Sequence, residues 1–459
     1  MRRRRLAAVA LALAAALAPT LGRAAVSAAP DDPYFPVQWA LHGAAASTQA
    51  NQAWCVSTGA GVLVADIDTG ADFSHPDLAT ALVAGAAFTS GNANPGNPST
   101  PADPAPDAAG TAAVADDYGH GTMTTGIVVA ATGNRTGIAG EAPGAHALVM
   151  KVFSNKGGTT GYSAYSSDVE SAIVWAVRHG ARVVNLSLGP NIPLASTALG
   201  DQIPAFVQWA AQNGAAVAIA AGNSTIPAAD YVGMSSYALV VGALAPSGAI
   251  ASYSQYGVGV NVYAPGGDGP SGDPRSDVIS TFPTYALPAA NQPLSANVAP
   301  GYAAYDGTSF ATPYTAGVLA LLIAHGLSAG QARQRILATE HTAGGTSQVL
   351  DAAAALGPCP AGSAPRGASS TGPATAGGPA HAAATAGAHT TPTPTATASA
   401  SGRAVRGEGA QPLTGTGDGP GASSGGDHPN SLLIAFLVAL LLLGGPVVVA
   451  LRRRLVQRP

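Results

Sequence analysis

The segments ARVVNLSL (181–188), IPAFVQWAAQNG (203–214) and AAVAIA (215–220) decide the fold. The first and third are short, continuous apolar runs, as in strands that are buried on both faces of a sheet. The middle segment is amphipathic and stops at a glycine, as helices commonly do. A strand, a helix and a second strand in series indicate a parallel sheet with helical crossovers.

Three segments further upstream extend this pattern. VLVADI (62–67) and ALVMKVF (147–153) are apolar runs of strand length, and VESAIVWAVRHG (169–180) is a second amphipathic helix that ends at a glycine. The sequence therefore predicts one α/β domain over residues 30–357. Its central sheet should be mostly parallel, with helices on both faces.

Three residues in this domain have the side chains that acyl transfer requires. Asp68 ends the first strand, His120 lies between glycines that would let a substrate backbone approach, and Ser309 opens a long apolar helix. A serine hydroxyl is a poor nucleophile until an imidazole can take its proton. The imidazole in turn needs a carboxylate to fix its tautomer and stabilise its charged form. The order Asp, His, Ser is one of the known orders of this triad, so we predict these three residues as catalytic.

A fourth segment, AIAAGNS (218–224), ends a strand in a Gly-Asn pair. The tetrahedral intermediate of acyl transfer needs hydrogen-bond donors directed at its oxyanion, and the side-chain amide of Asn223 and the backbone N–H of Ser309 are candidates. An α/β-hydrolase would instead place its serine in a Gly-x-Ser-x-Gly turn and its histidine last. The surroundings of Ser309 do not fit that pattern.

Five blocks, in this order, resemble the signature of the subtilisin-like serine proteases: DTG (68–70), GHGT (119–122), SLG (187–189), AAGN (220–223) and GTSFATP (307–313). Further stretches, such as NRTGIAGEAP (134–143), resemble the thermitase-like branch. The resemblance covers roughly residues 31–355. It implies a subtilisin-like three-layer α/β sandwich and a serine endopeptidase that acts on peptides or proteins without a catalytic cofactor.

The resemblance also implies two sets of binding residues. Ser187, Leu188 and Gly189 should pair with the substrate backbone, and Ala220, Ala221 and Gly222 should line the pocket for the residue before the cut.

The resemblance further implies a structural calcium ion that joins the N-terminal segment to the loop after the histidine block. Its ligands would be hard oxygen atoms, which suit calcium. The matching positions are Asp32, Asp77, the Asn134 side chain and the backbone oxygens of Ala131, Thr136 and Ile138. Alternatively, Asp32 and Asp77 are only turn residues.

Several features depart from the family pattern. The strand before the catalytic aspartate is usually apolar, but here it contains Asp66 on the same face as Asp68. This second carboxylate either raises a pKa at the site or reaches solvent. Met123 stands where the family usually has histidine, which indicates a change in packing. The long loops 90–115, 266–278 and 284–303 are either functional or tolerated insertions.

The two ends of the chain differ from the domain. Residues 1–29 read as a signal peptide, with four arginines before an apolar run. Residues 358–431 are rich in Ala, Gly, Pro and Thr and predict a disordered linker. The apolar run 432–451, at about 20 residues, is long enough to cross a membrane. The arginines at the start of the tail 452–459 predict a cytoplasmic C-terminus and an extracellular domain.

The chain has two cysteines, Cys55 and Cys359, which lie near the two ends of the predicted domain. In an exported protein such an even pair favours a disulfide, and two free buried thiols are the alternative. Charged residues make up only 10% of the chain and the net charge is −4, so there is no electrostatic basis for binding nucleic acid.

The overall layout resembles the mycosins, membrane proteases associated with type VII secretion, which makes a secretion complex a candidate partner. The sequence is also compatible with two other interpretations. One is a catalytically inactive binding module at the cell surface. The other is a sortase-linked cell-wall protease, suggested by QPLTG (411–415).

Overall fold

The computed structural model describes residues 29–156, 162–189, 194–195, 202–229, 232–269, 271–291 and 294–360. The predicted signal peptide up to residue 28, the linker from residue 361, the predicted membrane span 432–451 and the tail 452–459 lie outside the described residues.

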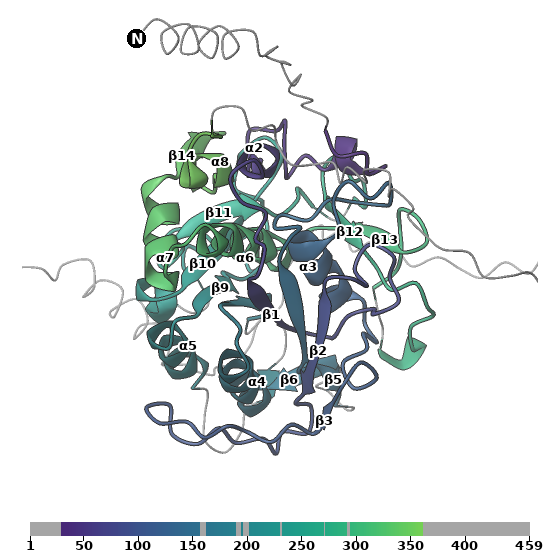
Figure 1. The fold of residues 1–459 in the computed structure, drawn as a ribbon, viewed down its shortest axis with the longest axis vertical. Helices are drawn as coiled ribbons and strands as arrows, with labels where there is room; N and C mark the ends of the chain where they lie inside the picture. The colour runs from purple at the N-terminus through teal and green to yellow at the C-terminus, as the bar shows by residue number, and fades with distance from the viewer. Residues whose placement is uncertain are drawn as a thin grey trace, which may run out of the picture. The chain divides into compact units, whose positions relative to one another are not determined.

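A sheet of ten strands forms the centre of the described domain, in the order β14-β15-β11-β10-β9-β7-β1-β4-β2-β3 (Figure 1). Every neighbouring pair from β15 to β2 runs parallel, and only the outermost pairs at the two edges are antiparallel. The predicted mostly parallel sheet is therefore confirmed. The strands are β1 Leu63–Asp68, β2 Leu82–Ala87, β3 Ala108–Ala109, β4 His146–Lys151, β7 Val183–Leu186, β9 Ala216–Ala220, β10 Leu239–Leu244, β11 Val262–Pro265, β14 His341–Ala343 and β15 Thr346–Val349.

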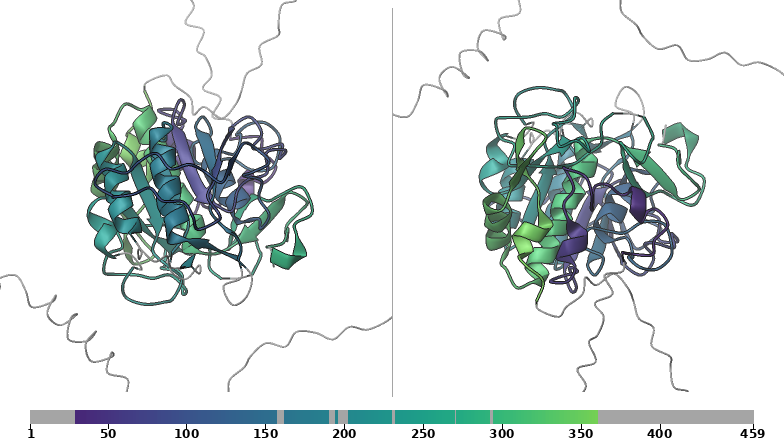
Figure 2. Two further views of the ribbon diagram at one scale, coloured as in Figure 1. Left: turned by 90° about the horizontal axis from the view of Figure 1, so that it is seen from below. Right: turned by 90° about the horizontal axis from the view of Figure 1, so that it is seen from above.

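Helices cover the sheet on both faces, as Figure 2 shows in two views. Helices α3 and α6 pack against each other and against the central strands, whereas α4 and α5 pack together on the sheet from the other side. Residues 308–323 of α6 are all buried, so this helix forms part of the core. The helices are α2 Ala50–Ala53, α3 His120–Val129, α4 Ser166–Arg178, α5 Ile203–Gln212, α6 Thr308–Ala324, α7 Ala329–Ala338 and α8 Ala352–Leu356.

The remaining elements are short. A hairpin of β12 and β13 packs on α3 and precedes α6 in the chain. The predicted loop 284–303 therefore ends two residues early, because Tyr302 already belongs to β13. These elements are η1 Phe35–Val37, β5 Ser154–Asn155, β6 Tyr162–Tyr165, β8 Leu194–Ala195, η2 Val232–Ser236, β12 Val278–Thr281, η3 Ala289–Asn291 and β13 Tyr302–Tyr305.

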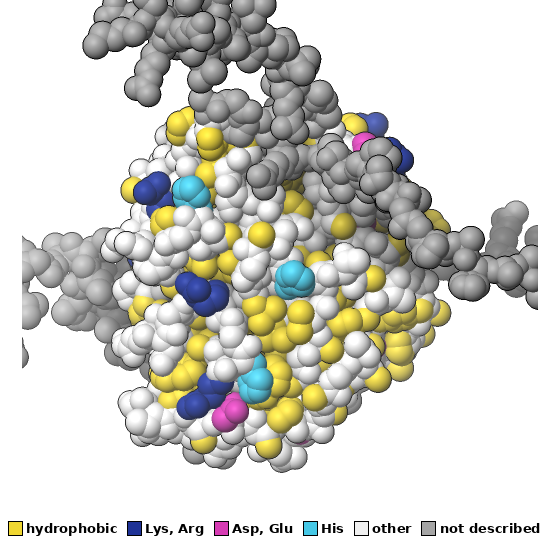
Figure 3. Space-filling model, in the orientation of Figure 1, with side chains coloured by type: hydrophobic (Ala, Val, Ile, Leu, Met, Phe, Trp, Pro, Cys, Tyr) yellow, Lys and Arg dark blue, Asp and Glu magenta, His cyan; other side chains and the backbone are white. Residues whose placement is uncertain are grey.

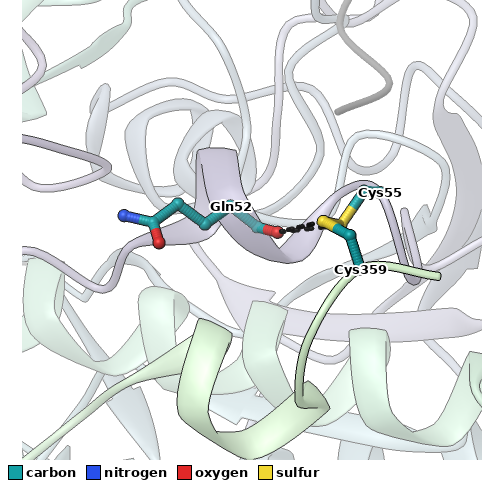
Figure 4. Close-up of a disulfide and its surroundings, with 3 residues drawn as sticks. All are labelled: Gln52, Cys55 and Cys359. Carbon is teal, nitrogen blue, oxygen red and sulfur yellow. Dashed lines mark hydrogen bonds between the residues drawn. A yellow bond between two sulfur atoms is a disulfide. The ribbon is translucent and has the colours of Figure 1, made fainter. Parts of the chain in front are cut away.

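The predicted disulfide is confirmed between Cys55 and Cys359, whose Cα atoms are 5.5 Å apart. Cys55 follows α2 and Cys359 follows α8, and the two helices contact each other. Figure 4 shows the backbone carbonyl of Gln52 lying against the bridge. The bond thus holds residue 359, two residues beyond the predicted end of the domain, against the N-terminal part of the chain.

The surface seen in Figure 3 carries a few separate Lys and Arg side chains among mostly uncharged atoms. Within the part of the chain that the structure describes, no single helix has the length and apolar composition needed to cross a membrane. Helices α6 and α7 reach these criteria only as a pair that is bent by 118°.

Candidate active site

The structure brings Asp68 and His120 into direct contact at the carboxyl end of the sheet. Asp68 is the last residue of β1 and is only 1% exposed, and His120 is the first residue of α3. Nδ1 of His120 lies 2.8 Å and 2.9 Å from the two carboxylate oxygens of Asp68. This arrangement places the proton of the imidazole on Nδ1 and leaves Nε2 available as a base.

Ser309 lines the same cavity as His120 and lies in the first turn of α6. Its hydroxyl donates to the backbone carbonyl of Ser187, at 3.2 Å. To pass its proton to His120, the Ser309 side chain must therefore turn away from this carbonyl. Catalytic hydrogen bonds often form only when substrate is bound, so this orientation is compatible with a nucleophile at rest.

The charge environment of His120 favours its protonated form. Burial lowers the pKa of His120, but the neighbouring carboxylate of Asp68, helped by Asp66 and Asp116, outweighs this effect and the pKa is raised above its ordinary value. A base with a raised pKa takes a proton from serine more readily, but it is neutral only at higher pH. Activity should therefore increase as the pH rises through this raised pKa.

Two glycines beside His120 are required by packing within the protein. Gly119 has a φ of 106°, and a Cβ on it would lie 2.5 Å from the ring of Phe282. A Cβ on Gly121 would lie 2.2 Å from the backbone oxygen of Gly70. The sequence interpretation assigned these glycines to substrate approach. The structure adds a second reason for them, the close contact of α3 with the turn after β1 and with the β12–β13 connection.

Asp116 is a structural residue of the site that sequence reasoning missed. It is buried, and its Oδ1 accepts from Thr69 Oγ1 at 2.9 Å, while its Oδ2 accepts from the backbone and hydroxyl of Thr122 at 2.9 Å and 2.6 Å. It thereby joins the turn after Asp68 to the first turn of α3. Its position just before the histidine block was the only sequence signal.

Asn223 is oriented so that its amide nitrogen is available to the cavity. Its Oδ1 accepts from both the backbone N–H and the hydroxyl of Thr308, each at 2.9 Å, which fixes which end of the amide is oxygen. The residue lines the cavity together with Ser309. The backbone N–H of Ser309 lies in the first turn of α6, where N–H groups have no partner within the helix. Both predicted oxyanion donors thus lie at the same end of α6.

Replacing Asn223 with alanine should lower kcat roughly 100- to 1,000-fold while changing KM little, because the amide acts on the transition state. Steady-state kinetics on a peptide substrate measures both constants. Asn213→Ala, at the exposed C-cap of α5, is the matched control and should keep full turnover. A kcat that Asn223→Ala leaves unchanged would remove this amide from the oxyanion hole.

The predicted substrate-binding segments lie next to each other in space. Ser187, Leu188 and Gly189 follow β7, and Ala220, Ala221 and Gly222 end or follow β9, the parallel neighbour of β7. The cavity that His120, Asn223 and Ser309 line has a volume of about 320 Å³, and none of these six residues is part of its lining. Its lining includes Tyr118, Phe153, Tyr162, Leu294, Tyr305 and Phe310.

One wall of this cavity comes from the connection between β12 and β13, which contains one of the predicted loops. The backbone N–H of Leu294 donates to the carbonyl of Tyr118 at 3.0 Å, and the ring of Tyr118 stacks on Tyr162 at 4.5 Å. Asn291 in the same connection donates to the carboxylate of Asp117 at 3.1 Å. This loop therefore packs on the residues that lead into His120.

The residues proposed for calcium also come together. Asp32 and Asp77 are both buried, and the segment 131–138 lies between them. Asp32 accepts from the backbone of Gly133 and Asn134, and Asp77 accepts from Ile138 N–H and from the Asn134 amide at 2.8 Å. Burial, with a contribution from Asp32, raises the pKa of Asp77 to about 6. The described residues contain no group of three or more His, Cys, Asp or Glu side chains that could hold a metal.

Together with the parallel sheet, the order of carboxylate, imidazole and hydroxyl along the chain is that of the subtilisin class of serine peptidases. The family model of the Subtilase family matches residues 59–358, so the chain belongs to that family. It is therefore a subtilisin-like serine endopeptidase, a hydrolase.

Similar proteins agree with this assignment. Thermitase of Thermoactinomyces vulgaris is 34% identical over 317 residues, which are 69% of this chain and 93% of thermitase. A thermophilic serine proteinase of Bacillus sp. strain AK1 is 33% identical over 305 residues, but the match spans only 62% of that protein and 65% of this chain. Among solved structures, a protease of Pseudoalteromonas arctica PAMC 21717 superposes with a TM-score of 0.58 at 26% identity, covering 72% of this chain and 99% of that one.

Proposed function

We propose that the enzyme cleaves peptide bonds through an acyl-enzyme intermediate on Ser309. The observation that carries this proposal is the contact of His120 Nδ1 with both oxygens of Asp68, which leaves Nε2 available as a base at the cavity that His120 lines. His120 takes the Ser309 proton as Oγ attacks the substrate carbonyl. Asn223 and the Ser309 N–H stabilise the oxyanion. The protonated imidazole then gives its proton to the leaving amine, and water hydrolyses the ester by the same steps.

The enzyme is proposed to work outside the cell while attached to the membrane through residues 432–451. The arginine cluster after this run supports a cytoplasmic tail. The Cys55–Cys359 bridge supports export, because disulfides persist mainly in oxidising compartments. Its substrates would then be proteins or peptides at the membrane surface, including components of a secretion complex of the mycosin type.

External protease added to intact spheroplasts should release the catalytic domain and leave a small membrane fragment that contains residues 432–459. Ser309→Ala is used as the starting protein, so that cleavage cannot come from the enzyme itself. Epitope tags at the C-terminus and in the domain follow the two products. A domain that stays protected until the cells are lysed would reverse the proposed topology. Loss of residues 432–459 from the untreated protein would instead favour the sortase-linked alternative.

The cluster around Asp32 and Asp77 is proposed to hold a structural calcium ion. Asp32 and Asp77 are both buried, and the negative charge of each makes it harder for the other to ionise. A cation bound between the two carboxylates would offset this repulsion. The Asn134 amide lies 2.8 Å from Asp77, and an amide can present its oxygen to a metal after a flip. Backbone oxygens of residues 131, 136 and 138 would complete the ligands. Calcium would join the N-terminal segment to this loop and would take no part in the reaction.

Calcium at about 100 times its dissociation constant should stabilise the domain by roughly 3 kcal/mol, which raises Tm by several degrees. Thermal unfolding with calcium and with chelator measures the effect. Asp77→Asn should lose most of this response, while the exposed control Asp103→Asn should retain it. A wild-type Tm that ignores both calcium and chelator would exclude the site.

A further inference from the structure

Asp66 is a buried carboxylate that the mechanism above does not use. It is 1% exposed and lies on β1 two residues before Asp68, so both side chains point to the face covered by α3. In the sheet register it stands opposite Asn185 on β7. The alternative that Asp66 reaches solvent is therefore excluded.

The carboxylate of Asp66 joins two elements of the site. Oδ2 accepts from the hydroxyls of Thr124 and Thr125 on α3, at 2.8 Å and 2.6 Å. Oδ1 accepts from the side-chain amide of Asn185, at 2.8 Å. The helix that begins with His120 and the strand that precedes Ser187 are thus held by one side chain.

The contact with β7 continues to the nucleophile. The Asn185 amide also donates to Ser187 Oγ at 3.0 Å, and Ser187 Oγ donates to the backbone carbonyl of Ser309 at 2.7 Å. In a regular helix this carbonyl would accept from the N–H four residues later. That residue is Pro313, which has no N–H. The Ser309 carbonyl therefore has no N–H partner four residues later in the helix. It accepts instead from Ser187, at the end of the series of hydrogen bonds that begins at Asp66.

We propose that Asp66 is a positioning residue that sets the placement of both Ser309 and His120. It holds α3 through two threonines, and it holds the first turn of α6 through Asn185 and Ser187. Its negative charge also adds to the electric field at the imidazole of His120. This inference rests on the acyl-enzyme mechanism proposed above. Three donors converge on one buried group, and a carboxylate can accept all of them. An apolar residue would remove the acceptor of all three, although Thr124 also donates to the Gly121 carbonyl and Asn185 also donates to Ser187.

The charge of Asp66 has its own consequence for the pH dependence. Burial and the neighbouring Asp68 raise the pKa of Asp66 to about 7, and the charged groups that interact with it are Asp68 on β1 and His120 on α3. As the pH falls through this range, Asp66 takes up a proton and its charge disappears. His120 then binds its own proton less tightly. The acid limb of kcat/KM should therefore be broader than the titration of a single group.

Two substitutions separate charge from position. Asp66→Asn keeps an oxygen for Asn185 and lets the threonine hydroxyls rotate to accept, so kcat should stay within about threefold of wild type. The acid limb of its kcat/KM profile should follow the titration of a single group, with a midpoint at lower pH than that of wild type. Asn185→Leu keeps the carboxylate but breaks the series of hydrogen bonds to Ser187. The Asn185 hydrogen bond lowers the pKa of Asp66, so its loss raises that pKa further and kcat is compared at a pH well above 7, where Asp66 is charged in both proteins. Under this condition kcat should fall roughly 10- to 100-fold at nearly constant KM.

Glu141→Gln is the control for both variants. Glu141 is a fully buried carboxyl whose side chain hydrogen-bonds to Thr48 and not to Asp66, Asn185 or Ser187. It should leave both kcat and the acid limb unchanged. Thermal unfolding and labelling of Ser309 by a fluorophosphonate show that each variant is folded. If Asp66→Asn and Asn185→Leu both match wild type in kcat and in pH profile, the inference is wrong. If wild-type enzyme itself fails to label or to hydrolyse peptides, it is the acyl-enzyme mechanism that fails.

Discussion

Replacing Ser309 with alanine should lower kcat for peptide hydrolysis by about a millionfold and leave only residual catalysis. The substitution removes the atom that forms the acyl-enzyme, and the remaining oxyanion donors cannot replace a nucleophile. Kinetics on a chromogenic peptide measures the loss, and failure of a fluorophosphonate to label the variant confirms its cause. Labelled wild-type enzyme would also exclude the interpretation of the chain as an inactive binding module.

The fold should survive this substitution, because Ser309 Oγ makes one hydrogen bond, to the Ser187 carbonyl. Its loss costs about 1 kcal/mol. Ser328→Ala is the matched control, since Ser328 also lies at a helix N-terminus and accepts from the Gln331 backbone as the cap of α7. It should cost a similar ~1 kcal/mol of stability yet keep full activity. Hydrolysis above background by a pure Ser309→Ala preparation would contradict the assignment.

The regular part of the fold could be predicted from the sequence because its elements have continuous patterns. The apolar runs predicted as strands became β1, β4, β7 and β9, with bounds that differ by at most two residues. Both amphipathic segments became helices, α4 and α5. Strands such as β3 and β5 have two residues each, too few for any periodic signal. They are defined by their pairing with β2 and β6, not by a pattern of their own.

The side-chain network of the site could be predicted only in part. The triad and Asn223 follow from residue types and their order. The structure places His120, Ser309 and Asn223 at one cavity, and the buried Asp68 contacts His120. Asp66 was recognised as unusual, but its partners Thr124, Thr125 and Asn185 lie 58 to 119 residues away in sequence. Sheet register and helix rotation decide such contacts, and no local pattern reports them.

Replacing Cys55 and Cys359 together with serine should lower the free energy of unfolding by roughly 5 kcal/mol, because the bridge closes a loop of 304 residues in the unfolded chain. A domain of this kind has a total stability of about 5–15 kcal/mol, so the variant should unfold at a much lower temperature. Denaturant unfolding of the oxidised wild type and of the double variant measures the difference.

The effect should come from the bridge and not from the side chains, so the single variant Cys55→Ser must lose about as much stability as the double variant. Activity at low temperature should remain near wild type in both, because the bridge links α2 to the end of the domain and neither cysteine lines the active-site cavity. Wild-type protein treated with reductant should behave like the variants. Equal midpoints for oxidised wild type and the double variant would show that residues 358–360 hold to the N-terminal segment without the bond, and that the bridge contributes little to stability.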